Sequence, residues 1–267
     1  MPELPEITVL ARQMKTELVG KTIIAIEVLQ PKSLNVPEEE FIIALTGAEI
    51  RDVSARGKWI FVETTRGWLL LCLGMGGEIL LVTRDTLPEK RRLVFDFTDG
   101  TCLVVNFWWF GYAHWTDDLT RHKMTAKLGP NALDLSAGDL RRMLSGRRGR
   151  IKSFLMDQSK VAGIGNVYIQ DILFRAGLHP LRTINTLSDV QIDALARAIR
   201  ESLQTGIDLG GSAWEMDLYG RKGRYDESCL LVGYREGRPC PECGTIIEKI
   251  KTGSTSGFIC PRCQPLE

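Results

Sequence analysis

The sequence predicts an α+β multidomain protein with an N-terminal β-sandwich and its flanking helix, a helical middle region and a short C-terminal ribbon. Three observations predict this fold class. Residues 21–115 are rich in β-branched and aromatic residues interrupted by Gly, Asp and Asn, residues 137–205 show helical apolar spacing, and residues 240–263 hold two cysteine pairs. A length of 267 residues suits two or three domains, which we expect over residues 1–130, 131–228 and 229–267.

Strand-like runs define the first region. They occupy residues 21–30, 57–64, 67–77, 78–83 and 92–115. The last run contains FTDGTCLVV, in which an Asp-Gly pair between two strand-like segments predicts a β-hairpin. The apolar spacing of residues 10–18 predicts the flanking helix.

The middle region is expected to be helical over residues 137–144, 167–176 and 188–205, where apolar residues recur at helical spacing. Ser188 is a suitable N-cap for the third helix. Gly206 is expected to end that helix.

Composition excludes several classes of protein. With 44% hydrophobic and 25% charged residues, the chain is that of an ordinary folded protein. The longest apolar stretch, residues 68–73, is too short to span a membrane, and the N-terminus has no secretory signal pattern, so we expect a cytoplasmic protein without a membrane partner. Cysteine usage does not match a disulfide framework, and free thiols are expected at Cys72, Cys102 and Cys229.

The cysteine-bearing tail carries the most specific local signal. Two CxxC pairs are separated by 16 residues, which is the spacing of a four-thiolate zinc ribbon. All four positions would be taken by protein ligands, so one structural Zn²⁺ is expected rather than a catalytic one. The expected ligands are Cys240, Cys243, Cys260 and Cys263. A redox-active cysteine pair is the alternative.

Two features of the middle region point to phosphate. Residues 141–152 (RRMLSGRRGRIK) hold six basic and no acidic residues, which makes either a solvated face or a stripe that contacts phosphates. Residues 163–166 (GIGN) precede a helix and could bind phosphate through backbone N–H groups. They lack the third glycine and the preceding strand of a dinucleotide-binding site. A helical motif that binds the DNA backbone is therefore favoured over a nucleotide cofactor site.

Three separated features resemble the formamidopyrimidine-DNA glycosylase and endonuclease VIII family: MPELPE at the start, GIGNVY with LFRAGLHP in the middle, and a tail that contains CPRCQ. The resemblance runs nearly end to end. It implies a β-sandwich, a helix–two-turn–helix module and a zinc ribbon around a DNA cleft. It also implies a monomer that acts on double-stranded DNA with a damaged base or abasic site, associated with the nucleoid.

The same resemblance, together with amine chemistry, gives the first residues a role. Removal of Met1 would leave Pro2 with a secondary amine that can form an iminium with the sugar. Glu3 is the expected proton shuttle, and Glu6 would position it or the amine. Lys58 matches the family's β-hairpin lysine and would hold a phosphate or assist proton transfer.

Further residues match or depart from the family's DNA contacts. Lys152 and Asn166 match residues that hold the phosphates beside the lesion. Where many members have Asp-Pro-Arg-Arg-Phe-Gly, this chain has Asn-Phe-Trp-Trp-Phe-Gly at residues 106–111, without the arginine that reads the orphaned base. The candidates to fill the gap left by the flipped base are Met75, Trp108, Trp109 and Phe110. Burial in the core is the alternative for the two tryptophans.

Two other departures concern the zinc hairpin and the base pocket. The family's hairpin arginine falls at Thr255, where Lys251 or the backbone of Gly253 would have to compensate. The loop near the base pocket has an unusual lining of Trp214, Glu215 and Tyr219. These departures predict a divergent paralogue for bulky or alkylated bases with relaxed choice of the opposite base.

Two hypotheses from different classes follow. The first is a bifunctional DNA glycosylase and abasic-site lyase that cuts by β- or β,δ-elimination, because Pro2, Glu3 and Lys58 are all present. The second is a non-catalytic or weakly catalytic damage-binding protein, because two DNA-contacting arginines are absent.

Overall fold

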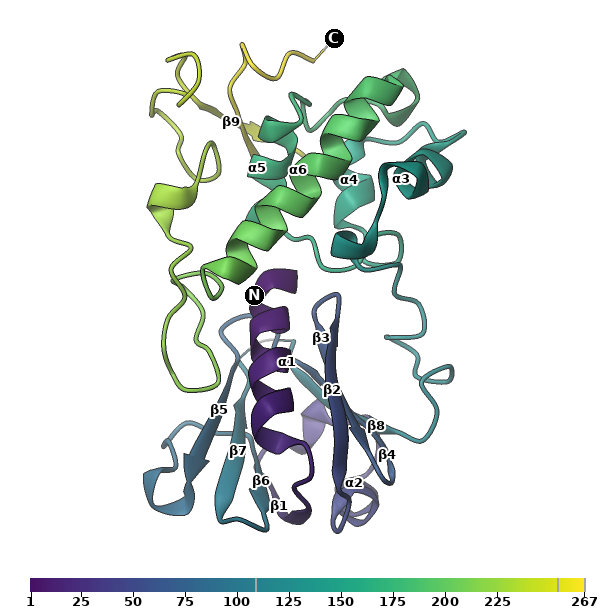
Figure 1. Ribbon diagram of the computed structural model, residues 1–267, viewed down its shortest axis with the longest axis vertical. Coiled ribbons are helices and arrows are strands. Elements are labelled where there is room, and N and C mark those ends of the chain that lie inside the picture. The colour runs from purple at the N-terminus through teal and green to yellow at the C-terminus, as the bar shows by residue number, and fades with distance from the viewer. Residues whose placement is uncertain (109, 254, 267) are drawn as a thin grey trace. The chain divides into compact units, whose positions relative to one another are not determined.

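The computed structural model describes the whole chain except residues 109, 254 and 267. The chain forms two compact units (Figure 1). The first comprises residues 1–127 and 207–224, and the second comprises residues 128–206 and 225–267. A division into three domains at residues 130 and 228 stays a prediction.

The first unit contains two four-stranded antiparallel sheets, which confirms the predicted β-sandwich. Their strand orders are β1-β6-β7-β5 and β2-β3-β4-β8. The strands are β1 (Ile23–Val28), β2 (Ile50–Arg56), β3 (Trp59–Thr64), β4 (Gly67–Cys72), β5 (Glu78–Thr83), β6 (Leu93–Phe97), β7 (Thr101–Asn106) and β8 (Tyr112–Thr116). The sequence did not predict β2, because its polar residues hide the strand pattern.

The β6–β7 hairpin is where the sequence places it. Leu93 pairs with Val105, and Asp96 pairs with Cys102. Gly100 in the connecting turn has a φ of 84°, a conformation that glycine adopts without strain. The Asp-Gly signal therefore identified a real turn.

Helix α1 (Leu4–Leu18) flanks the sheets and packs its apolar face into the core of this unit (Figure 1). It begins six residues earlier than predicted. A capping box formed by Glu3 and Glu6 starts the helix, since each carboxylate accepts a backbone N–H of the first turn. Helix α2 (Glu38–Leu45) buries Phe41 against Phe95, with ring centroids 6.3 Å apart.

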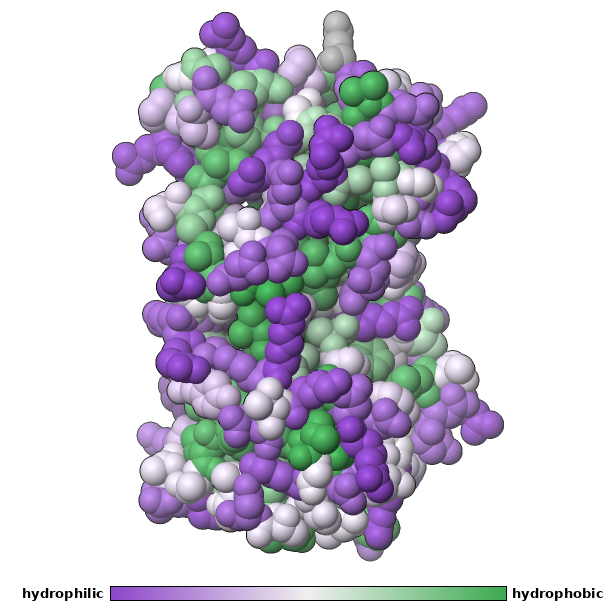
Figure 2. Space-filling view, viewed as in Figure 1, coloured by the Kyte–Doolittle hydropathy of each residue, from purple (hydrophilic) through white to green (hydrophobic). Residues whose placement is uncertain are grey.

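The second unit is mainly helical and ends in a two-stranded sheet. Its helices are α3 (Ala137–Leu144), α4 (Ile151–Met156), α5 (Tyr168–Arg175) and α6 (Asp189–Asp208), and its strands are β9 (Glu248–Lys251) and β10 (Ser256–Ile259). Among the described residues of both units, short 3₁₀ turns lie at Pro31–Ser33, Arg84–Thr86, Ala132–Asp134, Ile184–Thr186 and Glu227–Cys229. Hydrophilic residues cover most of the exposed side of α6 in the view of Figure 2.

The start of α6 confirms one sequence prediction and its end corrects another. Ser188 caps the helix, because its Oγ accepts the Gln191 N–H at 3.3 Å. Gly206 does not stop the helix, which continues to Asp208. A Cβ at Gly206 would lie 2.5 Å from the Tyr168 hydroxyl, so this glycine serves close packing, and the chain leaves the helix at Gly210 (φ 77°).

Within the described part of the chain, every helix is too short or too polar to cross a membrane.

Candidate functional site

The start of the chain is built around two buried carboxylates. The side chains of Glu3 and Glu6 are 3% and 5% exposed, and Pro2 is buried beside them. Glu6 accepts the Glu3 N–H at 2.8 Å through one oxygen and the Ser212 N–H at 2.9 Å through the other. Buried carboxylates need such donors, so Glu6 fixes the first turn of α1 to a loop more than 200 residues away.

A third carboxylate meets the amino group of the chain. The terminal nitrogen of Met1 lies 3.1 Å from Glu215 Oε1. Burial raises the pKa of the Glu215 carboxyl, the terminal ammonium opposes this rise, and the negative charge of Glu3 adds to it. The structure therefore gathers Glu3, Glu6 and Glu215 around the amino end.

The loop that carries Glu215 is fastened to α1. Gln13 donates to the Asp217 carboxylate at 3.0 Å and accepts the Leu218 N–H at 3.0 Å. The Tyr219 hydroxyl donates to Glu17 at 2.7 Å. Leu218 is fully buried, so the loop has an apolar anchor as well as polar ones.

The predicted pocket lining divides into exposed and buried parts. Trp214 and Tyr219 are 51% and 43% exposed, whereas the Glu215 side chain is only 16% exposed. Trp214 and part of Tyr219, whose ring is covered on one face by the Arg221 guanidinium at 4.6 Å, thus remain exposed, while the carboxylate is largely shielded from water.

Lys58 is placed at the turn between β2 and β3, where Gly57 has a φ of 60°. Its side chain is half-buried. Its positive charge acts on Cys72 at the end of β4, where burial raises the thiol pKa and Lys58 partly opposes the rise. The lysine thus lies in the β2–β3 turn, at the start of the strand-like run that the sequence predicts over residues 57–64.

The wedge candidates lie on two neighbouring loops. Met75, Trp108 and Phe110 are 51%, 64% and 71% exposed. A Cβ on Gly76 would lie 3.6 Å from Trp108, so the two loops are side by side. Phe110 has a φ of 57°, a strained conformation for a non-glycine residue. Trp109 lies outside the described residues, and for Trp108 the alternative of burial in the core is wrong.

In the second unit, Lys152 is buried rather than exposed, at 2%. Its Nζ donates to Thr252 Oγ1 at 2.9 Å, to the Ser256 carbonyl at 2.6 Å, and to Thr255 Oγ1 and Asn166 Oδ1 at 3.2 Å each. Burial lowers the pKa of this ammonium to about 8. The position predicted to contact phosphate is therefore tied to the β9–β10 hairpin, with Thr255 among its partners.

The basic stretch at residues 141–152 divides into paired and solvent-exposed arginines. Arg141 and Arg142 form ion pairs with aspartates of the same unit. Arg148 and Arg150 are exposed and line an open pocket of about 520 Å³. Part of the stretch is thus structural, and part faces solvent with a net positive charge.

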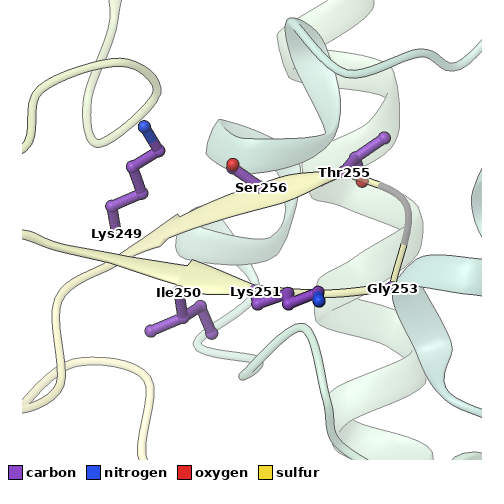
Figure 3. A pocket seen from close by; sticks show the side chains of 6 residues that line it. All are labelled: Lys249, Ile250, Lys251, Gly253, Thr255 and Ser256. Atoms are coloured by element: carbon purple, nitrogen blue, oxygen red, sulfur yellow. The ribbon is translucent and has the colours of Figure 1, made fainter.

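The β9–β10 hairpin lines another open pocket, of about 470 Å³ (Figure 3). Lys249, Lys251, Gly253 and Thr255 are among its lining residues. In Figure 3 the Lys251 side chain runs along the hairpin toward Gly253, whereas Lys249 points away from it. The Lys251 ammonium thus lies toward the hairpin tip, which carries the position where the sequence lacks an arginine.

The four tail cysteines converge, with all Sγ atoms within 4.8 Å of one another. Separations include 3.9 Å for Cys240–Cys263 and 3.4 Å for Cys243–Cys260. Tetrahedral zinc with Zn–S bonds of ~2.3 Å places sulfurs about 3.8 Å apart. The cluster therefore fits zinc with four thiolate ligands.

Comparison with known proteins agrees with this geometry. Family models match in chain order: the formamidopyrimidine-DNA glycosylase N-terminal domain (residues 1–107), its H2TH domain (residues 128–217) and a zinc finger found in FPG and IleRS (residues 237–266). The chain belongs to the formamidopyrimidine-DNA glycosylase family. The first model ends at residue 107, directly before the two tryptophans that stand where many members have arginines.

Relatives of this family match over the full length. The formamidopyrimidine-DNA glycosylase of Chloroflexus aggregans is 38% identical, over 100% of this chain and 99% of its own. That of Pectobacterium atrosepticum is 35% identical, over 99% and 100%. The Lactococcus lactis Fpg, solved with DNA that contains an abasic site, superposes with a TM-score of 0.90 at 32% identity, over 98% of this chain and 99% of that one.

The predicted family, fold class and enzyme class, a DNA repair glycosylase and abasic-site lyase, are thereby confirmed. So is zinc binding by the cysteine cluster. Within this glycosylase, sequence reasoning missed the residues that fasten the pocket loop, Gln13, Glu17, Ser212 and Asp217. Polar residues of this kind are common on helices and loops, and no local spacing marked them.

Proposed function

We propose that this family member removes a damaged base from double-stranded DNA through an iminium formed by Pro2, and then nicks the abasic strand by β- or β,δ-elimination. The observation that supports this most is the amino end of the chain, which lies among buried carboxylates. Reduction with borohydride in the presence of abasic DNA tests the proposal, because it converts an iminium into a permanent protein–DNA crosslink.

The chemistry begins with removal of Met1, which exposes the secondary amine of Pro2. An α-amino group titrates near pH ~8, so a useful fraction is neutral at pH 7, unlike a lysine side chain at about 10.4. The nitrogen attacks the sugar carbon, and the bond to the flipped base breaks. The resulting iminium acidifies the adjacent sugar hydrogen, so elimination cleaves the strand.

Glu3 is proposed to transfer protons to the leaving group and to take them back during elimination. Its position supports this role, since it is buried at the first residue before α1. The Glu6 carboxylate accepts the Glu3 backbone N–H and would thereby position Glu3. Lys58, on the β2–β3 hairpin, would hold a phosphate of the DNA.

Replacement of Glu3 by Gln is expected to slow base excision by roughly 100-fold, the usual scale of general acid catalysis, and to slow cleavage of preformed abasic sites much less. Only departure of the base requires the carboxyl proton. Single-turnover rates on a damaged duplex and on an abasic duplex, compared for the same protein, check this. Equal losses on the two substrates would contradict the assigned role.

Further contacts with DNA are proposed from the second unit. Lactococcus lactis Fpg has been solved with DNA that contains an abasic site or a ring-opened base, which supports a damaged duplex as the partner here. Arg148 and Arg150 face solvent, and Lys251 stands on the zinc hairpin, so each is available to a phosphate. Lys152 and Asn166 would act beside them, in a monomer with one structural zinc ion per chain.

The exposed aromatic residues of the pocket loop support bulky or alkylated bases as substrates. Trp214 and Tyr219 offer flat surfaces on which a large ring can stack. The Lactococcus lactis relative has been solved with DNA that contains N7-benzyl-Fapy-dG, a lesion with an added aromatic group. A panel of oxidised, ring-opened and alkylated bases in matched duplexes tests this choice.

The opposite base is expected to matter little. Arginine hydrogen-bonded to the correct partner supplies roughly 1–3 kcal/mol of discrimination, whereas stacking on an indole is nearly indifferent to the base it meets. Trp108 is exposed on the loop where the family has that arginine. One lesion should therefore be processed at similar rates opposite A, C, G and T in single-turnover assays. A strong preference for C would show that another residue reads the base.

A damage-binding protein without efficient catalysis is the second candidate. It is favoured by Thr255, which replaces a cationic side chain and is a partner of the buried Lys152 instead. Borohydride distinguishes the two functions, because a binding protein forms a complex with abasic DNA that dissociates in denaturant, whereas the lyase leaves a covalent crosslink.

A further inference from the structure

The Glu215 carboxylate forms an ion pair with the chain's first nitrogen, at 3.1 Å. Removal of Met1 makes the Pro2 nitrogen the first one, a shift of one residue or about 3.8 Å along the chain. That distance is within the reach of a glutamate side chain. The same carboxylate is therefore available to the amine that reacts.

The place of Glu215 is set by a tightly packed loop. Gly211 lies against Glu6, to which its Cβ would approach within 3.1 Å, and Gly223 lies on the Gly211 carbonyl, where a Cβ would be only 2.0 Å away. The Glu215 N–H donates to the Ser212 carbonyl at 3.3 Å and closes a turn. These close contacts and the turn restrict movement of the loop backbone, so the Glu215 carboxylate is already in position before the substrate binds.

We propose that Glu215 is a further catalytic residue: it binds the Pro2 ammonium, orients the nitrogen and accepts its proton before attack. This inference rests on the proposed Pro2 chemistry. On an abasic aldehyde, the ammonium passes one proton to Glu215 and the neutral nitrogen bonds to the sugar carbon. The oxygen then takes two protons, the one returned by Glu215 and the second N–H proton of the nitrogen, and leaves as water while the nitrogen lone pair completes the iminium.

The charges around Glu215 suit a proton acceptor. Glu3 faces it from the start of α1, and burial together with this negative charge raises the proton affinity of Glu215. Glu6 is occupied on both oxygens by backbone N–H groups of Glu3 and Ser212, which favour its ionised form. Glu215 and Glu6 thus differ in proton affinity, and Glu215 is the better proton acceptor of the two.

The test is the pH dependence of borohydride crosslinking to a preformed abasic duplex, measured in single turnover. Glu215→Gln removes the ion pair that stabilises the ammonium, so the acidic limb of the rate profile should move to lower pH by about one unit. The maximal rate should also fall, by roughly 100-fold. Glu215→Asp, which keeps the charge, should restore the wild-type limb and part of the rate.

Glu17→Gln is the matched control, because it weakens the Tyr219 anchor of the same loop and leaves the Glu215 carboxylate in place. Its acidic limb should coincide with that of the wild type. If the wild-type protein forms the crosslink and the acidic limb of Glu215→Gln lies at the same pH as that of the wild type, the role of Glu215 is overturned and Pro2 remains the nucleophile. Absence of any crosslink from the wild-type protein would overturn both.

Discussion

Replacement of Pro2 by Gly is expected to remove most strand cleavage, with a loss of roughly 100-fold or more in the single-turnover rate on abasic DNA. The proline ring fixes the direction of its nitrogen, whereas a terminal glycine rotates freely and is no longer held toward the sugar. Glycine also has an amine that can form an imine, so slow residual crosslinking is compatible with the proposal. Rates of nicking and of borohydride crosslinking check the prediction.

Pro5→Gly provides a matched control in the same stretch. Pro5 lies in the first turn of α1 and is buried like Pro2, but its nitrogen is part of a peptide bond. This variant should lose some stability, about 0.5–1 kcal/mol for glycine in a helix, and should keep crosslinking. A Pro2→Gly protein that nicks abasic DNA at the wild-type rate would remove Pro2 as the nucleophile.

The fold was predictable wherever a local signal was sufficient. The Asp-Gly turn at Gly100 and the Ser188 cap each depend on a few adjacent residues, and the structure has both. The prediction for Gly206 was wrong because the sequence reveals only the conformational freedom of a glycine. The structure shows that a side chain at this position would clash with the Tyr168 ring of another helix. Tertiary packing decided that position.

The candidate site was predictable in its residue types and not in its connections. Pro2 and Glu3 stand next to each other in the sequence, so the resemblance to the family together with amine chemistry was enough to predict their roles. The bond from Glu6 to Ser212 and the pair between Met1 and Glu215 join segments that are more than 200 residues apart. No spacing within one segment can report such a contact.

Lys152 shows a second limit of sequence reasoning. A lysine in a basic stretch is expected to face solvent, and this one is enclosed by the zinc hairpin. Three of its four described acceptors, Thr252, Thr255 and Ser256, belong to that hairpin. The ribbon is thus connected to the phosphate-binding candidates by hydrogen bonds as well as by the chain, and its folding should affect them.

That connection sets the expected result of removing zinc. Cys260→Ser should reduce bound zinc well below the proposed one ion per chain, because it removes one of four thiolate ligands, and the ribbon should unfold, because structural zinc contributes about 10–16 kcal/mol to small domains of this kind. Ribbon unfolding would then take away the Lys251 contact and leave the Lys152 ammonium without its hairpin acceptors. DNA affinity should fall by at least about tenfold at moderate salt, since phosphate contacts supply most of it.

Cys229→Ser separates this effect from the loss of any thiol, because Cys229 belongs to the same unit and lies outside the cluster. It should retain one zinc ion and wild-type DNA binding. Metal analysis of the purified proteins, together with duplex titrations over a range of salt concentrations, checks both variants. Cys260→Ser should bind with a weaker salt dependence than Cys229→Ser, because fewer phosphates are neutralised once the hairpin is lost. A Cys260→Ser protein with full zinc, or one without zinc that binds DNA like the wild type, would show that the four-thiolate site does not organise the ribbon for binding.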